Sequence, residues 1–113
     1  MCGAEYQTEH HHYQMDPVCA VCRTPRPTTI MVPATNVCES GWTLEYSGYV
    51  MGSHRSNPSG HEAVCMDSSF ESRAGSSAND NGFLFFLMFT KCGSLPCPPY
   101  QGNQLVTCAV CSK

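Results

Sequence analysis

Cysteine is the residue that most constrains how this chain can fold, because nine of its 113 residues are cysteines. The tetrapeptide Cys-Ala-Val-Cys occurs twice, at residues 19–22 and again at residues 108–111. Thiols at this density are hard to keep free in a reducing compartment, whereas a small chain in an oxidising compartment can use them as disulfides. The sequence therefore predicts a secreted, disulfide-rich domain.

Length, charge and hydropathy exclude several other classes of protein. A chain of 113 residues suits one compact domain. Its net charge is −3 with no cluster of lysine or arginine, so it lacks the electrostatic footprint of a nucleic-acid or anionic-membrane binder. The longest apolar run, residues 83–89, is far shorter than the ~20 residues that span a bilayer. We therefore expect neither nucleic-acid binding nor membrane insertion.

The N-terminal segment and the odd number of cysteines indicate a piece of a longer protein. Residues 1–16 form a polar arm, and residues 1–20 hold no apolar run long enough for a signal peptide. Nine thiols cannot all pair within one chain, so at least one partner must lie outside it. We therefore expect a processed fragment of a secreted protein whose signal peptide is not in this chain.

Alternating apolar and polar residues give the clearest strand signal, over residues 42–47. The alternation places Trp42, Leu44 and Tyr46 on one face of a half-buried strand. Gly48 interrupts this pattern, and the strand can continue beyond a bulge at that point. The segment therefore predicts a long strand with one apolar face.

Further strands and one long loop are expected in the rest of the chain. Apolar or β-branched segments predict strands at residues 28–32, 61–66 and 105–110. The continuously apolar run 83–89 fits a central strand buried on both faces, whereas the serine- and glycine-rich residues 67–82 predict a surface loop. No segment combines a 3.6-residue period with a helix cap. The predicted fold class is mainly β: a small disulfide-rich antiparallel β domain with long irregular loops.

Several short motifs follow one another in an order that resembles a known family. They are Cys-Glu-Ser-Gly-Trp, Tyr-Ser-Gly-Tyr followed by a histidine, Cys-Met-Asp, a close cysteine pair leading into Pro-Pro-Tyr, and the final Cys-Ala-Val-Cys, at residues 38–42, 46–54, 65–67, 92–100 and 108–111. Over residues 18–113 this order resembles the C-terminal non-collagenous domain of sponge-type short-chain collagens. It is similar, more distantly, to one of the two tandem halves of that domain in type IV collagen. The chain has no Gly-X-Y run of its own.

The resemblance implies a division of the chain and a function. Residues 1–22 would be the tail of a truncated first half-repeat, and residues 23–113 the complete second half. The implied role is structural, in the extracellular matrix, where such a module takes part in assembly and chain association. Its partners would be other matrix or collagen chains, including copies of itself in a homo-oligomer.

The resemblance also implies a pattern of disulfides, which the residues by themselves leave open. The implied pairs are Cys38 with Cys111, Cys65 with Cys108, and Cys92 with Cys97. Three further cysteines would be unpaired or bonded to the missing first half, namely Cys2, Cys19 and Cys22. In this interpretation the unpaired thiols and the odd cysteine count have one common cause.

The cysteines and histidines could also serve metal binding or catalysis. The two Cys-Ala-Val-Cys segments could supply four zinc ligands, but the gap between residues 22 and 108 is far longer than zinc-ribbon spacing. A thiol-disulfide oxidoreductase needs its motif at a helix start, and a cysteine protease needs one singled-out thiolate. The consecutive histidines of residues 10–12 are more typical of an exposed arm than of a metal site. We therefore expect no enzymatic activity, no cofactor and no metal.

One polar loop is a candidate ligand site. Tyr49, His54, Arg55 and Asn57 lie beside a turn and combine aromatic, cationic and amide groups, which is what stacking on a sugar and hydrogen bonding to it require. A solvated loop without a ligand accounts for the same residues. Secreted β domains often act as lectins, so a carbohydrate-binding (lectin-like) module is the alternative function, on fold-level analogy.

Overall fold

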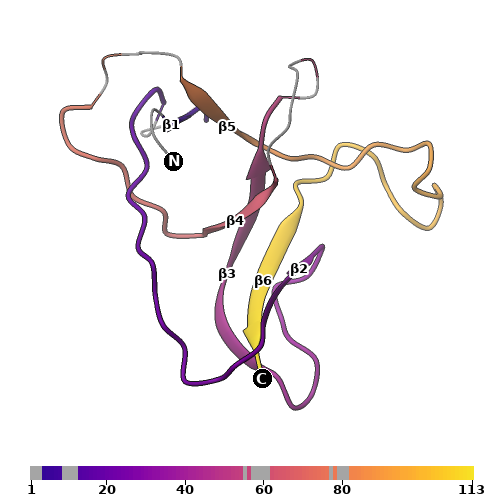
Figure 1. Ribbon diagram of the computed structural model, residues 1–113. Coiled ribbons are helices and arrows are strands. Elements are labelled where there is room, and N and C mark those ends of the chain that lie inside the picture. Colours follow the sequence, from indigo (N-terminus) through magenta and orange to yellow (C-terminus); the bar gives the residue numbers. More distant parts are fainter. Residues whose placement is uncertain (1–3, 9–12, 55, 57–61, 77, 79–81) are drawn as a thin grey trace.

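The computed structural model describes residues 4–8, 13–54, 56, 62–76, 78 and 82–113, and this part of the chain contains strands and no helix (Figure 1). Six strands follow in order: β1 (Ala4–Tyr6), β2 (Thr29–Pro33), β3 (Thr43–Gly52), β4 (Val64–Asp67), β5 (Phe83–Leu87) and β6 (Thr107–Ser112). Over the described ranges, no helix is long and apolar enough to cross a bilayer. The predicted fold class, a small disulfide-rich β domain, is confirmed.

The six strands form one sheet organised around β3. The strand order is β1-β5-β3-β6-β2, and β4 pairs with β3 outside this path. Gly48 of β3 pairs with Asp67 of β4 and also with Cys108 of β6, so β4 and β6 lie on opposite edges of β3. The named strands pair antiparallel except β1 and β5, which are parallel. The sheet is therefore mixed, with β1 as the parallel member.

Strand boundaries agree with the sequence in outline and differ in detail. The two segments expected on either side of Gly48 form one continuous strand, β3, and its register shift lies earlier, between Leu44 and Tyr46. Gly48 lies within the ladder, because it has register partners in both β4 and β6. A glycine that looked like an interruption is therefore inside the strand.

The apolar core lies where β1, β4, β5 and the end of β3 meet. Its buried members are Ala4, Tyr6, Met51, Met66 and Phe85. The expectation of a polar arm over residues 1–16 is wrong for β1, since Tyr6 is fully buried. Parallel pairing with β5 draws this short segment into the core (Figure 1).

The first half of β3 has its apolar side chains exposed. Leu44 is 45% exposed and Tyr46 is 36% exposed, so the prediction that these two side chains belong to a buried face is wrong. Buried residues of this strand lie at its other end, at Val50 and Met51. The physical reason is that β4 and β5 pair only with residues from Gly48 onward.

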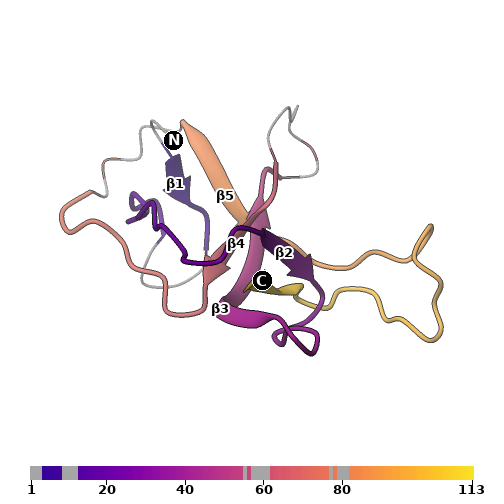
Figure 2. The same ribbon diagram turned by 60° about the horizontal axis from the view of Figure 1, so that its bottom comes forward.

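Residues 88–106 form a narrow arm that projects from the sheet in both views (Figures 1 and 2). Within it the amide of Thr90 donates to the carbonyl oxygen of Gln104 at 2.8 Å, and the amide of Asn103 donates to the carbonyl oxygen of Thr90 at 2.8 Å. Phe89 is 56% exposed at the base of the arm. The prediction that residues 83–89 form a strand buried on both faces is therefore wrong for most of its side chains. Phe85 is buried, the other residues of β5 are half-buried, and Met88 and Phe89 are exposed where the chain leaves the core.

Candidate functional site

Three disulfides cross-link the chain, two of them between distant segments, and they are the pairs that the resemblance implies. They link Cys38 to Cys111, Cys65 to Cys108 and Cys92 to Cys97. Because Cys108 and Cys111 are bonded, they cannot act as thiolate ligands with Cys19 and Cys22, and the zinc alternative fails. Among the described residues, no group of three or more histidine, cysteine or acidic side chains could hold a metal ion. Cys2 and residues 10–12 lie outside the described residues.

Two free thiols, Cys19 and Cys22, are both exposed. They lie on the segment that runs down one side of the sheet before it enters β2 (Figure 1). Its start is attached where the amide of Val18 donates to the carbonyl oxygen of Glu71 at 3.3 Å. Val21, between the two cysteines, is fully exposed. The other end of the segment is held where Thr28 and Lys113 exchange backbone hydrogen bonds, so the segment presents a dithiol to solvent between two attachment points.

Tyr6 connects this segment to the core. Its phenol donates a hydrogen bond of 2.9 Å to the carbonyl oxygen of Glu71, the same oxygen that accepts from the amide of Val18. Burial and, to a smaller extent, the negative charge of Cys19 together raise the pKa of Tyr6 to about 12. The dithiol segment therefore lies against a neutral, buried phenol.

Apolar side chains lie beside the dithiol. Met31 of β2 and Tyr46 of β3 both pair with Val110 of β6, so the three side chains share one face of the sheet. Burial is the largest cause that raises the pKa of Tyr46. The negative charges of Asp67, Cys19 and Cys22 raise it by smaller amounts. Such effects act over short distances, so both thiols lie near the Tyr46 phenol. Met31 and Tyr46 are more than one-third exposed.

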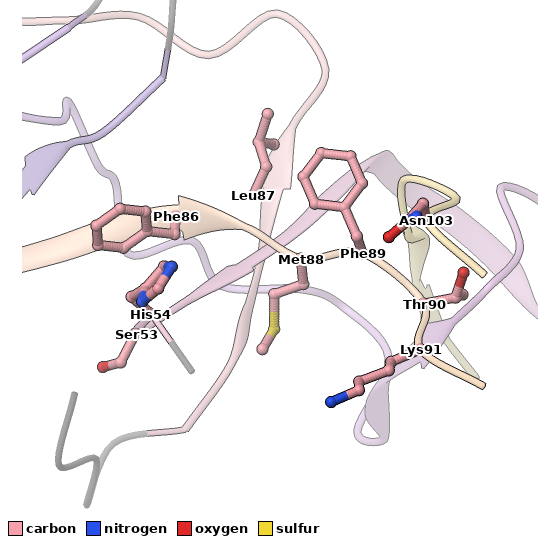
Figure 3. A pocket seen from close by; sticks show the side chains of 9 residues that line it. All are labelled: Ser53, His54, Phe86, Leu87, Met88, Phe89, Thr90, Lys91 and Asn103. Atoms are coloured by element: carbon pink, nitrogen blue, oxygen red, sulfur yellow. The ribbon is translucent and has the colours of Figure 1, made fainter. Parts of the chain in front are cut away.

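A second candidate site is a cleft of about 450 Å³ where the end of β3 meets the base of the arm. Its lining residues are Ser53, His54, Phe86, Leu87, Met88, Phe89, Thr90, Lys91 and Asn103. Figure 3 shows Ser53 and His54 on one side and Lys91 on the other, with Met88 between them. In Figure 3, Phe89 and Asn103 lie on the side of the ribbon that is away from Ser53, His54 and Met88. The cleft thus combines hydrogen-bond donors with apolar surface.

His54 is held in one tautomer by its neighbour. The backbone amide of Ser56 donates to Nδ1 of His54 at 3.3 Å, and the Ser56 hydroxyl lies 2.6 Å from the same nitrogen. An amide can only donate, so Nδ1 is the acceptor and the neutral ring carries its proton on Nε2. The ring packs against Phe86 with 5.0 Å between centroids. His54 therefore supplies a positioned donor beside an aromatic ring.

Two of the four residues proposed from sequence as a ligand loop are described, Tyr49 and His54, and of these two only His54 lines the cleft. Tyr49 is half-buried within β3, and Arg55 and Asn57 lie outside the described residues. The sequence reasoning missed Phe86, Met88 and Lys91, and it assigned the first two to the core. No local signal marks them, because they meet His54 only through the pairing of β3 with β5.

No protein-family model matches the chain, and no solved structure matches it. Three disulfides in a domain of this size are compatible with an extracellular location. The structure thus assigns the chain to the class of small disulfide-rich β domains.

Proposed function

We propose that this chain is an extracellular structural module that associates with other matrix chains, as its resemblance to collagen non-collagenous domains implies. The observation that carries the proposal is the contrast among its described cysteines. Six are bonded in three disulfides, whereas Cys19 and Cys22 are free and exposed. In an oxidising compartment such thiols are readily oxidised, so we infer that their sulfur partners lie on another chain.

The surface beside the thiols supports this proposal. Met31 and Tyr46 expose apolar surface on the face that the charges of Cys19 and Cys22 reach. Exposed apolar surface at one place is typical of contact sites between proteins. A second chain docked there would bury these side chains and bring its own sulfur close to the dithiol.

The covalent step conserves atoms and electrons. One thiol of this chain and one of the partner lose two protons and two electrons to a protein disulfide donor of the secretory pathway. A sulfur–sulfur bond forms between the chains, and the donor's disulfide is reduced to two thiols. Alternatively, a thiolate of this chain attacks a partner disulfide and releases one partner thiolate.

The test is expression of the full chain in an oxidising compartment, followed by non-reducing electrophoresis and peptide mapping. We expect disulfide-linked species that involve Cys19 or Cys22, with the three internal disulfides intact. The double variant C19S/C22S should lose these species and keep the internal disulfides. Val21→Ser is the matched control, since it changes the same exposed segment and removes no thiol.

Two outcomes would contradict the proposal. One is a wild-type chain that stays free of intermolecular bonds, with both thiols still open to alkylation after secretion. The other is an internal Cys19–Cys22 disulfide, which would leave no sulfur for a partner. His54→Gln should not affect association, because this residue lies in the cleft and not beside the dithiol.

A further inference from the structure

The cleft beside His54 presents hydrogen-bond donors that have no partner among the described residues. They are the hydroxyl of Ser53, Nε2–H of His54 and the ammonium group of Lys91, and all three residues line the cleft. The two salt bridges of the described residues involve Arg26 and Arg73, so Lys91 has no carboxylate within 4.0 Å there. Groups that can donate, one of them a cation, call for a ligand that accepts and carries negative charge.

Lys91 is one of three described cations that have no salt bridge, and the others are Arg23 and Lys113. The chain has a net charge of −3 and only six lysine and arginine residues. Of the three described cations without a salt bridge, Lys91 is the one that lines the cleft. In Figure 3 the Lys91 side chain extends back along the chain toward Met88, on the side that faces Ser53 and His54. Its charge is directed over the cleft and not away from it.

The apolar part of the cleft suits a ligand ring that packs one face on the protein and leaves the other face in water. Phe86 is half-buried against His54, and Met88 is 36% exposed at the centre of the cleft. Because His54 and Lys91 are also exposed, the cleft leaves much of a ligand in contact with water. A wholly apolar ligand would gain little there, whereas a sugar ring can pack its C–H face on these side chains and keep its hydroxyls solvated.

We propose that this cleft binds a sugar ring that carries a carboxylate, such as a hexuronic acid residue. Lys91 pairs with the carboxylate, Ser53 and Nε2–H of His54 donate to ring oxygens or hydroxyls, and the apolar face of the ring packs on Phe86 and Met88. This goes beyond chain association and is independent of it, because the cleft and the dithiol share no residue. The site includes His54 from the polar loop identified in the sequence, and it adds Phe86, Met88 and Lys91.

The experiment titrates the full chain with D-glucuronic acid and, in parallel, with D-glucose, by calorimetry and ligand-observed NMR. Glucuronic acid should bind saturably, and glucose should bind at least about tenfold more weakly, because it lacks the charge-assisted hydrogen bond. A glucuronic-acid-containing oligosaccharide in a third arm distinguishes a free acid from a unit within a polymer. Tighter binding of the oligosaccharide would assign the site to the polymer.

Variants separate this cleft from general attraction between charges. Lys91→Gln should weaken glucuronic acid binding about tenfold or more. Phe86→Leu should weaken both sugars, since it removes the aromatic surface. Arg23→Gln is the matched control, because Arg23 is exposed and far from the cleft-lining residues. Circular dichroism and the disulfide map confirm that each variant folds.

Three results would overturn the proposal. Absence of saturable binding by either acidic probe would remove the site altogether. Equal affinities for glucuronic acid and glucose would remove the role of the carboxylate. Equal losses in Lys91→Gln and Arg23→Gln would show attraction to net charge and no defined cleft. A wild-type chain that forms no intermolecular disulfide but still binds glucuronic acid would contradict chain association and leave this proposal standing, so the two failures are distinguishable.

Discussion

The carbonyl oxygen of Met66 occupies the space that a side chain at Gly48 would need, since a Cβ atom on Gly48 would overlap it. Strands on opposite edges of a central strand are normally about 9–10 Å apart, twice the strand spacing. Here the Cα atoms of Cys65 in β4 and Cys108 in β6 are 5.9 Å apart and their sulfurs are bonded. The flanking strands therefore close over β3 at Gly48.

Gly48→Ala should lower the free energy of unfolding by about 3 kcal/mol, because the new methyl group meets backbone that cannot move without disturbing β4. Gly52→Ala is the matched control in the same strand. Its Cβ would lie 3.5 Å from the sulfur of Met88, an ordinary contact with a flexible side chain, so we expect a change below about 1 kcal/mol. Urea unfolding under non-reducing conditions measures both values, and equal values would contradict the close approach.

The disulfides should contribute unequally to stability. Cys38 and Cys111 are separated by 73 residues, whereas Cys92 and Cys97 are separated by 5. In the chain-entropy model, removing the long cross-link costs about 4–5 kcal/mol and removing the short one about 2 kcal/mol. Urea unfolding of C38S/C111S and C92S/C97S under non-reducing conditions compares them. A larger loss in the second variant would show that the arm tip supports the fold more than loop length implies.

Two tyrosines make the same hydrogen bond in different surroundings. The phenol of Tyr6 donates to the carbonyl oxygen of Glu71 at 2.9 Å in the core, and that of Tyr46 donates to the carbonyl oxygen of Cys65 at 2.9 Å at the surface. Tyr6→Phe should cost about 1–1.5 kcal/mol, because water cannot replace the lost donor. Tyr46→Phe should cost less than about 0.5 kcal/mol. Thermal or urea unfolding measures both, and equal costs would contradict the burial of Tyr6.

Glu45 should make the fold sensitive to acid. The Ser112 hydroxyl donates a hydrogen bond to the Glu45 carboxylate. Nη2 of Arg26 donates another to Oε1 at 2.7 Å. These two hydrogen bonds lower the pKa of Glu45 from its ordinary 4.5. A lowered pKa stabilises the folded state above about pH 4.5, and this stabilisation is lost as the pH falls through the folded-state value. Glu45→Gln should therefore be less stable than wild type at pH 6, with the difference shrinking toward pH 3.

Arg26→Gln provides the check on this interpretation. If the hydrogen bonds to Glu45 cause the acid sensitivity, the double variant R26Q/E45Q should behave like E45Q alone at low pH. Unfolding curves between pH 3 and pH 6 provide the comparison. A difference between wild type and E45Q that stays constant across this range would contradict the shifted pKa.

Much of the strand content could be predicted from local pattern. β2 overlaps the segment expected at residues 28–32, and β3 contains the predicted alternation. Prolines and glycines mark boundaries through local backbone restriction, which needs no tertiary context. β1 escaped prediction because three residues are too few to show a period, and because its pairing partner β5 lies far along the chain.

The candidate sites were predicted less well than the strands. His54 was identified by its type and its position beside a turn. Lys91 and Met88 were not, since they reach the same cleft only because the arm begins where β5 leaves β3. The exposure of Tyr46 was also missed, because alternation shows which side chains share a face and not whether another element covers that face.

By itself the sequence determined that this is a cysteine-rich, mainly β chain without a cluster of basic residues and without an apolar run long enough to span a bilayer. These properties follow from composition and local backbone preference. Only the tertiary structure decided that Tyr6 is buried, that Cys19 and Cys22 face solvent, and that Lys91 borders a cleft with His54. Burial and proximity depend on which distant strands pair, and this pairing is decided by interactions across the whole sheet.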